Sequence, residues 1–205
     1  MIKKIISFLF ENKTIRQTVA KNTFWLFSGE FLGRLLRTAI VIYAARILGA
    51  EGWGIFSYAI TISALFSFFS DLGLSPIITR EGSKNPEMRE QYLSTAFFIK
   101  ILLLLFSTLT IIFIVPFFTK IEATKNILPI IALTFIFDGL IEFGLSFNRA
   151  LEKMEREALV KIIVNLVIVS LGITSLIFMP SAKSLAIAYA IGSGVGLLIT
   201  ITILR

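Results

Sequence analysis

The chain has 205 residues, of which 56% are hydrophobic and only 16% are charged, and its formal net charge is +7. About 25% of the residues of a soluble domain are charged, so this composition excludes an ordinary soluble domain and indicates a membrane protein. Cysteine and histidine are absent, which excludes disulfides, thiol catalysis, zinc sites and histidine proton shuttles. We therefore expect no metal site and no cofactor.

Residues 1–21 are predicted to form a cytoplasmic segment at the membrane interface. Lys3 and Lys4 precede an apolar run that is too short for a signal peptide, and no cleavage-like site follows it. The remaining pattern is partly amphipathic, as is typical of a helix lying on a membrane surface.

Residues 22–205 are predicted to form one all-α bundle of six transmembrane helices. The apolar stretches are long enough to cross a bilayer and lie at about residues 23–48, 54–70, 92–119, 126–148, 160–179 and 184–204. Gly49 and Gly52 are expected to end the first span and Asp71 the second. A charged loop is expected over residues 80–90.

The distribution of basic residues predicts the orientation. Thirteen lysines and arginines lie in the N-terminal segment and after the second, fourth and sixth spans. The loops on the opposite side hold only three, Lys120, Lys125 and Lys183. Cytoplasmic loops carry the excess of basic residues. Both termini are therefore expected on the cytoplasmic side of the cytoplasmic (inner) membrane. The positive net charge then reflects membrane topology rather than a nucleic-acid partner.

Three charged residues lie in the middle of the first span. Glu30, Arg34 and Arg37 fall on one helical stripe, and Glu30 can pair with Arg34 four residues later. A charge at the bilayer centre costs at least about 2.5–3.5 kcal/mol on insertion scales, so this stripe is expected to face protein or a water-filled cavity. From the residues alone, the stripe either contacts a charged substrate or locks neighbouring helices together.

Two carboxylates, Asp138 and Glu142, share one face of the fourth span, which Arg149 extends toward the following loop. Paired carboxylates in a membrane can carry a proton or hold Na⁺, and coupling to H⁺ or Na⁺ is one interpretation. The alternative is that they pair with first-span arginines or reach the cytoplasmic interface. Lys100, in the third span, is expected either to reach the interface or to line a cavity.

The sixth span carries small residues at four-residue spacing: Ala188, Gly192 and Gly196 in one row and Ala186, Ala190 and Gly194 in another. Such rows allow helix backbones to approach closely within a membrane. Close helix packing is the expected role, and a helix that bends during transport is the alternative.

Three segments resemble the N-terminal half of Wzx-type polysaccharide flippases, which share a superfamily with lipid II flippases and MATE antiporters. The first is NTFWLFSGEFLGRLLRTAIVIYAARILGAEGWGIFSYA, residues 22–59. The second is FSDLGLSPIITRE, residues 69–81, and the third is FNRALEKMEREALVKI, residues 147–162. The resemblance rests on pattern and hydropathy and covers essentially the whole chain.

The resemblance implies a transporter, not an enzyme, that flips polyprenyl-(pyro)phosphate-linked oligosaccharide across the cytoplasmic membrane by alternating access. The chain would be the N-lobe of a two-lobe transporter, completed by a missing C-terminal six-helix lobe or by a second copy. Guanidinium groups bind phosphate oxygens through paired, charge-assisted hydrogen bonds. Arg34 and Arg37, with Glu30, are therefore the predicted binding residues for the substrate head group, and Asp138 and Glu142 the predicted coupling residues.

Three other functions compete with this one. A MATE-like antiporter of small organic cations would need an anionic cavity, which the first-span arginines disfavour. A membrane glycosyltransferase or phosphotransferase would need carboxylates or histidines at the membrane edge, usually with a metal. The loop acids, Glu157 among them, instead alternate with bases as solvated helical faces do. A non-transporting scaffold would leave the charges within the spans unexplained.

Overall fold

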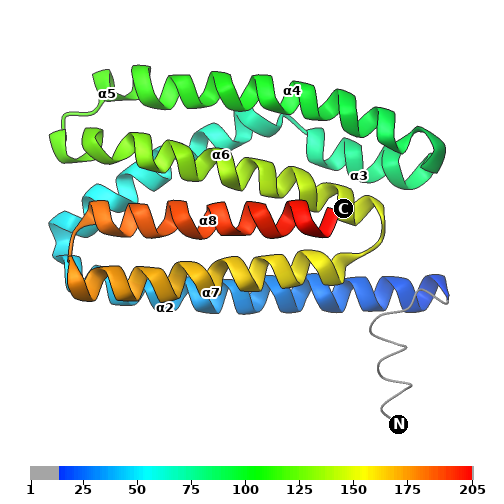
Figure 1. The fold of residues 1–205 in the computed structure, drawn as a ribbon, viewed down its shortest axis with the longest axis horizontal. Coiled ribbons are helices and arrows are strands. Elements are labelled where there is room, and N and C mark those ends of the chain that lie inside the picture. Colours follow the sequence, from blue (N-terminus) through cyan, green and yellow to red (C-terminus); the bar gives the residue numbers. More distant parts are fainter. Residues whose placement is uncertain (1–13, 205) are drawn as a thin grey trace, which may run out of the picture.

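The computed structural model describes residues 14–204, and over that range the protein is a bundle of long helices without a β-strand. In chain order these are α2 (Ile15–Asp71), α3 (Leu74–Lys84), the short 3₁₀ helix η1 (Pro86–Met88), α4 (Arg89–Leu109), the π-helical turn η2 (Thr110–Ile114), α5 (Val115–Phe118), α6 (Glu122–Ala150), α7 (Met154–Phe178) and α8 (Ala182–Leu204). The long helices lie side by side along one axis (Figure 1). The prediction of an all-α, polytopic membrane bundle is confirmed.

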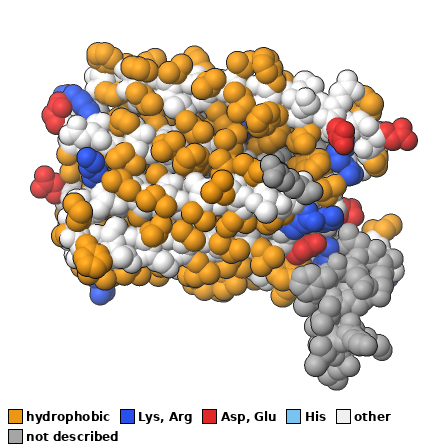
Figure 2. Space-filling model, viewed as in Figure 1, with side chains coloured by type: hydrophobic (Ala, Val, Ile, Leu, Met, Phe, Trp, Pro, Cys, Tyr) orange, Lys and Arg blue, Asp and Glu red, His pale blue; other side chains and the backbone are white. Residues whose placement is uncertain are grey.

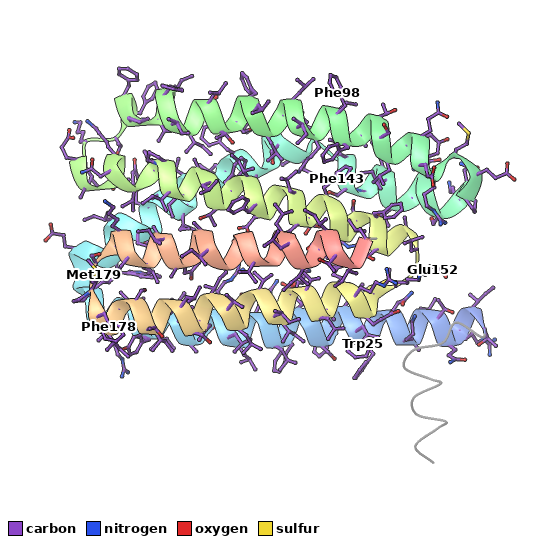
Figure 3. All side chains as sticks on the ribbon, viewed as in Figure 1. Trp25, Phe98, Phe143, Glu152, Phe178 and Met179 are labelled. Atoms are coloured by element: carbon purple, nitrogen blue, oxygen red, sulfur yellow. The ribbon has the colours of Figure 1, made fainter. Side chains whose placement is uncertain are left out.

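Five helical stretches within residues 14–204 are long and apolar enough to cross a membrane. Hydrophobic side chains cover most of the visible long face, whereas the charged ones gather toward the two ends (Figure 2). Phe98 projects from the outer face of α4 and is 66% exposed (Figure 3). An apolar belt of this kind suits a surface surrounded by lipid.

Helix α2 contains both the first and the second predicted span. Its 57 residues would measure about 86 Å if straight, far more than the roughly 30 Å hydrocarbon core. The helix breaks at Gly49, where φ is +67° and ψ is −176°. The chain turns back there (Figure 1), so α2 consists of a first arm, residues 15–48, and a second arm, residues 50–71.

Gly49 adopts a backbone conformation that is essentially restricted to glycine and costs other residues about 1–3 kcal/mol. We expect Gly49→Ala to lower the free energy of unfolding by about that amount, because the turn between the arms must strain or rearrange. The matched control is Gly54→Ala, since nothing lies within 4 Å of a Cβ added there. Thermal unfolding of both variants in detergent tests this, and equal stability would contradict it.

The region after the second span differs from the prediction. Helix α2 does end at Asp71, but Leu72 and Gly73 form a two-residue break with positive φ, and α3 begins at Leu74 and runs to Lys84. The expected loop over residues 80–90 is therefore wrong, because most of that range is helical. Pro76 is tolerated because it lies in the first turn of α3, where its missing N–H is not needed.

The third span changes its helix type just before Pro116. The span starts as α4, passes through the π-helical turn η2 and ends as α5, which carries Pro116 near its start. Proline cannot donate its backbone hydrogen bond, and a local π-bulge is a common response. Because α4 begins at Arg89 and α5 ends at Phe118, the helical stretch still matches the length of the predicted span.

The predicted N-terminal segment, residues 1–21, lies for the most part outside the described residues. Its last part is helical: Thr14 caps α2 by accepting a hydrogen bond from the Gln17 amide, 3.3 Å away. Lys21 is only 1% exposed, and its Nζ lies 3.2 Å from Glu155 Oε2 at the start of α7.

Close packing links the first arm of α2, α7 and α8. A Cβ added at Gly29 would lie 2.7 Å from the Ala158 Cα on α7, so only glycine allows this approach. On α8, Gly192 and Gly196 are buried against Ile168 and Val164 of α7. The small residues of the sixth span thus serve the expected close helix packing.

The turns sort into two groups at opposite ends of the bundle. The Gly49 break, the α5–α6 connection and the α7–α8 connection lie at one end, whereas the starts of α2 and α4 and the α6–α7 connection lie at the other (Figure 1). Glu152 marks the second end, and Phe178 and Met179 mark the first (Figure 3). This alternation is the arrangement that the six predicted spans require.

Candidate functional site

A polar cavity of about 640 Å³ lies between both arms of α2 and α3, α4 and α6. Its charged lining consists of Arg37, Asp71, Lys100, Asp138, Glu142 and Arg149, and its hydroxyl lining of Ser63, Ser67, Ser70, Ser75 and Thr134. We call this space the polar cavity. Its volume lies within the range of about 300–1,000 Å³ that is typical of small-molecule pockets.

A second, smaller cavity of about 400 Å³ lies between the first arm of α2 and α7. Its lining consists of Gly29, Glu30, Gly33, Arg34, Arg37, Lys161 and Asn165. Three of these side chains are cationic and one is anionic, so we call this space the basic cavity. The glycines make room for it, because a Cβ at Gly33 would lie 3.1 Å from the Asn165 amide nitrogen.

The predicted pair in the first span is present. Arg34 Nε donates to Glu30 Oε1 at 2.8 Å, and Lys161 Nζ on α7 donates to Glu30 Oε2 at 3.2 Å. Glu30 therefore orients Arg34 and also joins the first arm of α2 to α7. The arginine itself stays available, because its side chain is 78% exposed.

Arg37 lines both cavities and connects them. Among residues 14–204 it forms no ion pair within 4.0 Å, and it shares the lining of the polar cavity with Asp138. A guanidinium without an ion pair keeps its hydrogen-bonding capacity for an anion. The structure thus brings Arg34, Arg37 and Glu30 together at one cavity wall.

The two carboxylates of the fourth span both line the polar cavity, but their surroundings differ. Glu142 Oε1 accepts a hydrogen bond from Arg149 Nη2 at 2.5 Å, so its charge is already matched. Asp138 lines the same cavity without an ion pair to any described residue. Within residues 14–204, no group of three or more acidic side chains is arranged to hold a metal ion.

A network of ion pairs surrounds Glu157, and the sequence did not predict it. The alternation of charges predicts a solvated position for Glu157, but its side chain is 2% exposed. Its carboxylate accepts hydrogen bonds from Arg149, at 2.7 and 2.9 Å, and lies 3.0 Å from Lys161 Nζ. The expected solvated position is wrong because α7 begins at Met154, which buries Glu157 against α6. The four-residue spacing between Glu157 and Lys161 was the available signal.

The network is continuous from one helix to the next. It runs from Arg34 through Glu30 to Lys161, and from there through Glu157 and Arg149 to Glu142. The first arm of α2, α7 and α6 are therefore linked electrostatically along one path that joins the walls of both cavities.

Asp71 and Lys100 form a separate, partly buried pair beside the break between α2 and α3. Lys100 is 2% exposed and its Nζ lies 3.3 Å from Asp71 Oδ1, which also accepts from the Ser75 hydroxyl at 2.6 Å. Of the two positions expected for Lys100, the structure shows the cavity lining.

A family model described as polysaccharide biosynthesis protein matches residues 19–205, nearly the whole chain. All three segments on which the resemblance rested, residues 22–59, 69–81 and 147–162, lie inside the matched range. No curated protein and no solved structure matches the chain.

Proposed function

Because the chain belongs to the polysaccharide biosynthesis protein family, we propose that it flips a lipid-linked oligosaccharide across the cytoplasmic membrane, with both termini inside. The protein is a multi-pass membrane protein, and the family match agrees with the Wzx-type resemblance. The single observation that carries the proposal is the basic cavity, in which Arg34, Arg37 and Lys161 gather against one carboxylate.

The cargo carries a phosphate or pyrophosphate where its glycan joins the polyprenyl chain, and this anion must cross a medium of low dielectric constant. Burying an unpaired anion is very costly, whereas fixed cations in a wet cavity replace part of its hydration. Arginine suits this role because its guanidinium stays charged and binds two oxygens at once. A transporter of this kind performs no covalent chemistry on the glycan.

The side chain of Arg34 is 78% exposed, so this bundle leaves the basic cavity open beside it. An anion bound there needs a second wall to separate it from lipid. The proposal therefore includes a second six-helix unit, either a C-terminal lobe or a second copy, that rocks against this one in alternating access.

A MATE-like antiporter of organic cations is the alternative function. The polar cavity holds three carboxylates, but it also holds three cations, so it is not the anionic cavity that such a transporter needs. Proteoliposomes that contain the full natural protein distinguish the two functions. Movement of a labelled lipid-linked glycan between leaflets supports the flippase, whereas exchange of an organic cation without glycan movement would overturn it.

Asp138 is the proposed coupling group for H⁺ or Na⁺, because its carboxylate faces the polar cavity and is not committed to an ion pair, unlike Glu142. We expect Asp138→Asn to remove the dependence of transport on the ion gradient while leaving the folded protein intact. Flipping rates with and without imposed pH and Na⁺ gradients test this. An unchanged response to both gradients would assign Asp138 a structural role instead.

A further inference from the structure

The polar cavity has a row of hydroxyl groups that anion binding does not require. Ser63, Ser67 and Ser70 recur at four- and three-residue spacing, which places them on one face of the second arm of α2. Thr134 adds another hydroxyl from α6 and Ser75 one from α3.

Ser63 provides the most informative detail. The residue is 4% exposed, it lines the polar cavity, and its hydroxyl has no hydrogen-bond partner among residues 14–204. A buried hydroxyl without a partner is destabilising, and each such group in a folded protein calls for an explanation. A ligand hydroxyl in the cavity would supply the missing partner.

The neighbouring hydroxyls are positioned to accept hydrogen bonds. Ser67 donates its proton to the Ala64 carbonyl at 2.7 Å, and Ser70 donates to the Ser67 carbonyl at 3.0 Å. Each hydroxyl oxygen then has lone pairs left for a donor from a ligand. The row thus offers acceptor oxygens in the same cavity lining as Asp138 and Glu142.

The two cavities differ in charge. The polar cavity has three cations, Arg37, Lys100 and Arg149, and three anions, so its formal charges cancel. The basic cavity has three cations against Glu30 alone. An anionic group is therefore favoured in the basic cavity, and a neutral group rich in hydroxyls in the polar cavity.

Arg37 belongs to both linings, so the two cavities adjoin at this side chain. We propose that the polar cavity is a sugar subsite: it binds the neutral sugar units nearest the diphosphate while the diphosphate occupies the basic cavity. This inference rests on the proposed function. Ile131 and Phe135 supply apolar surface in the same lining, which suits the C–H faces of a sugar ring.

Two synthetic probes test the subsite: a short-chain isoprenyl diphosphate, and the same molecule with one neutral hexose on the diphosphate. Each is titrated calorimetrically into the full natural protein in detergent. We expect the Ser63→Ala/Ser67→Ala double variant to bind the hexose-bearing probe about fivefold to tenfold more weakly, since each neutral hydrogen bond contributes modestly. Its affinity for the bare diphosphate should stay within about twofold, because the hydroxyl row lies outside the basic cavity.

Ser83→Ala is the matched control, because Ser83 is exposed on α3 and bonds only locally, to the Arg80 carbonyl. A second variant, Ser67→Phe, fills the polar cavity and should weaken binding of the hexose-bearing probe at least tenfold. Ser63→Ala alone should raise the thermal stability of the unliganded protein slightly, because it removes a buried hydroxyl that lacks a partner.

The sugar subsite is overturned if the double variant and Ser67→Phe bind the hexose-bearing probe as tightly as the natural protein does, while the bare diphosphate still binds. That result leaves the proposed flippase function standing. If the natural protein does not bind the bare diphosphate at all, the proposed function itself fails, and the sugar subsite that rests on it fails with it.

Discussion

Replacing Arg34 and Arg37 together with alanine is expected to reduce transport of the lipid-linked glycan by about a hundredfold or more. Hydrogen bonds to charged groups contribute roughly 1.5–3 kcal/mol each, and the two guanidiniums are the cationic groups of the first arm that line the basic cavity. Losing both would leave Lys161 alone, and Glu30 would then repel the phosphate. The rate of glycan flipping in proteoliposomes, at matched protein content, measures the effect.

Graded variants separate charge from geometry at this site. Arg37→Lys keeps the positive charge but cannot bind two oxygens in one plane, so an intermediate rate is expected. Arg46→Ala is the control, because Arg46 is an exposed residue near the far end of the same arm, outside both cavities. Wild-type flipping by the double alanine variant would exclude head-group binding by this stripe.

Glu157→Ala is expected to be the most destabilising single change to the ion-pair network, at about 3 kcal/mol. The carboxylate is nearly fully buried and pairs with both Arg149 and Lys161. Removing one member of a buried network leaves uncompensated charge and typically costs about 3–5 kcal/mol. Here Glu142 and Glu30 still partner the two cations, which places the expected value at the lower end of that range.

The matched control for this prediction is Glu122→Ala. Glu122 also pairs with a lysine, Lys125, at 2.6 Å, but its side chain is 80% exposed. Pairs of this kind contribute about 0–1 kcal/mol. Chemical or thermal unfolding in detergent should therefore separate the two variants clearly, and equal losses of stability would mean that the Glu157 network contributes no more than an exposed pair.

These two predictions address different properties of one path of charges. Arg34, at one end of the path, is open to the basic cavity, and Arg37 lines the same cavity without joining the path. Glu157 is instead buried where α7 packs against α6. If the bundle changes shape during transport, the helices joined by Glu157 move as one unit, because separating them would expose a buried network. The Gly49 and Leu72–Gly73 breaks in α2 are the places where the backbone is already non-helical.

The membrane class, the helical bundle and the charged stripe of the first span were predictable from the sequence. Hydropathy over about twenty residues reports directly whether a segment can cross a bilayer, and the spacing of Glu30, Arg34 and Arg37 follows from helical geometry alone. The family resemblance depended on the same local patterns. The second-span boundary was right at Asp71, but the immediate restart at Leu74 was missed because Gly73 and Pro76 ordinarily indicate a loop.

Apart from local pairs such as Glu30–Arg34, the tertiary structure decided how the charges are partnered. Glu30 and Lys161 are 131 positions apart in the chain, and no local pattern predicts which helices will lie against each other. The burial of Glu157, the pairing of Lys100 with Asp71 and the division of the site into a basic and a polar cavity all depend on that packing. Hydropathy and periodicity describe one helix at a time, whereas a cavity is formed by several helices together.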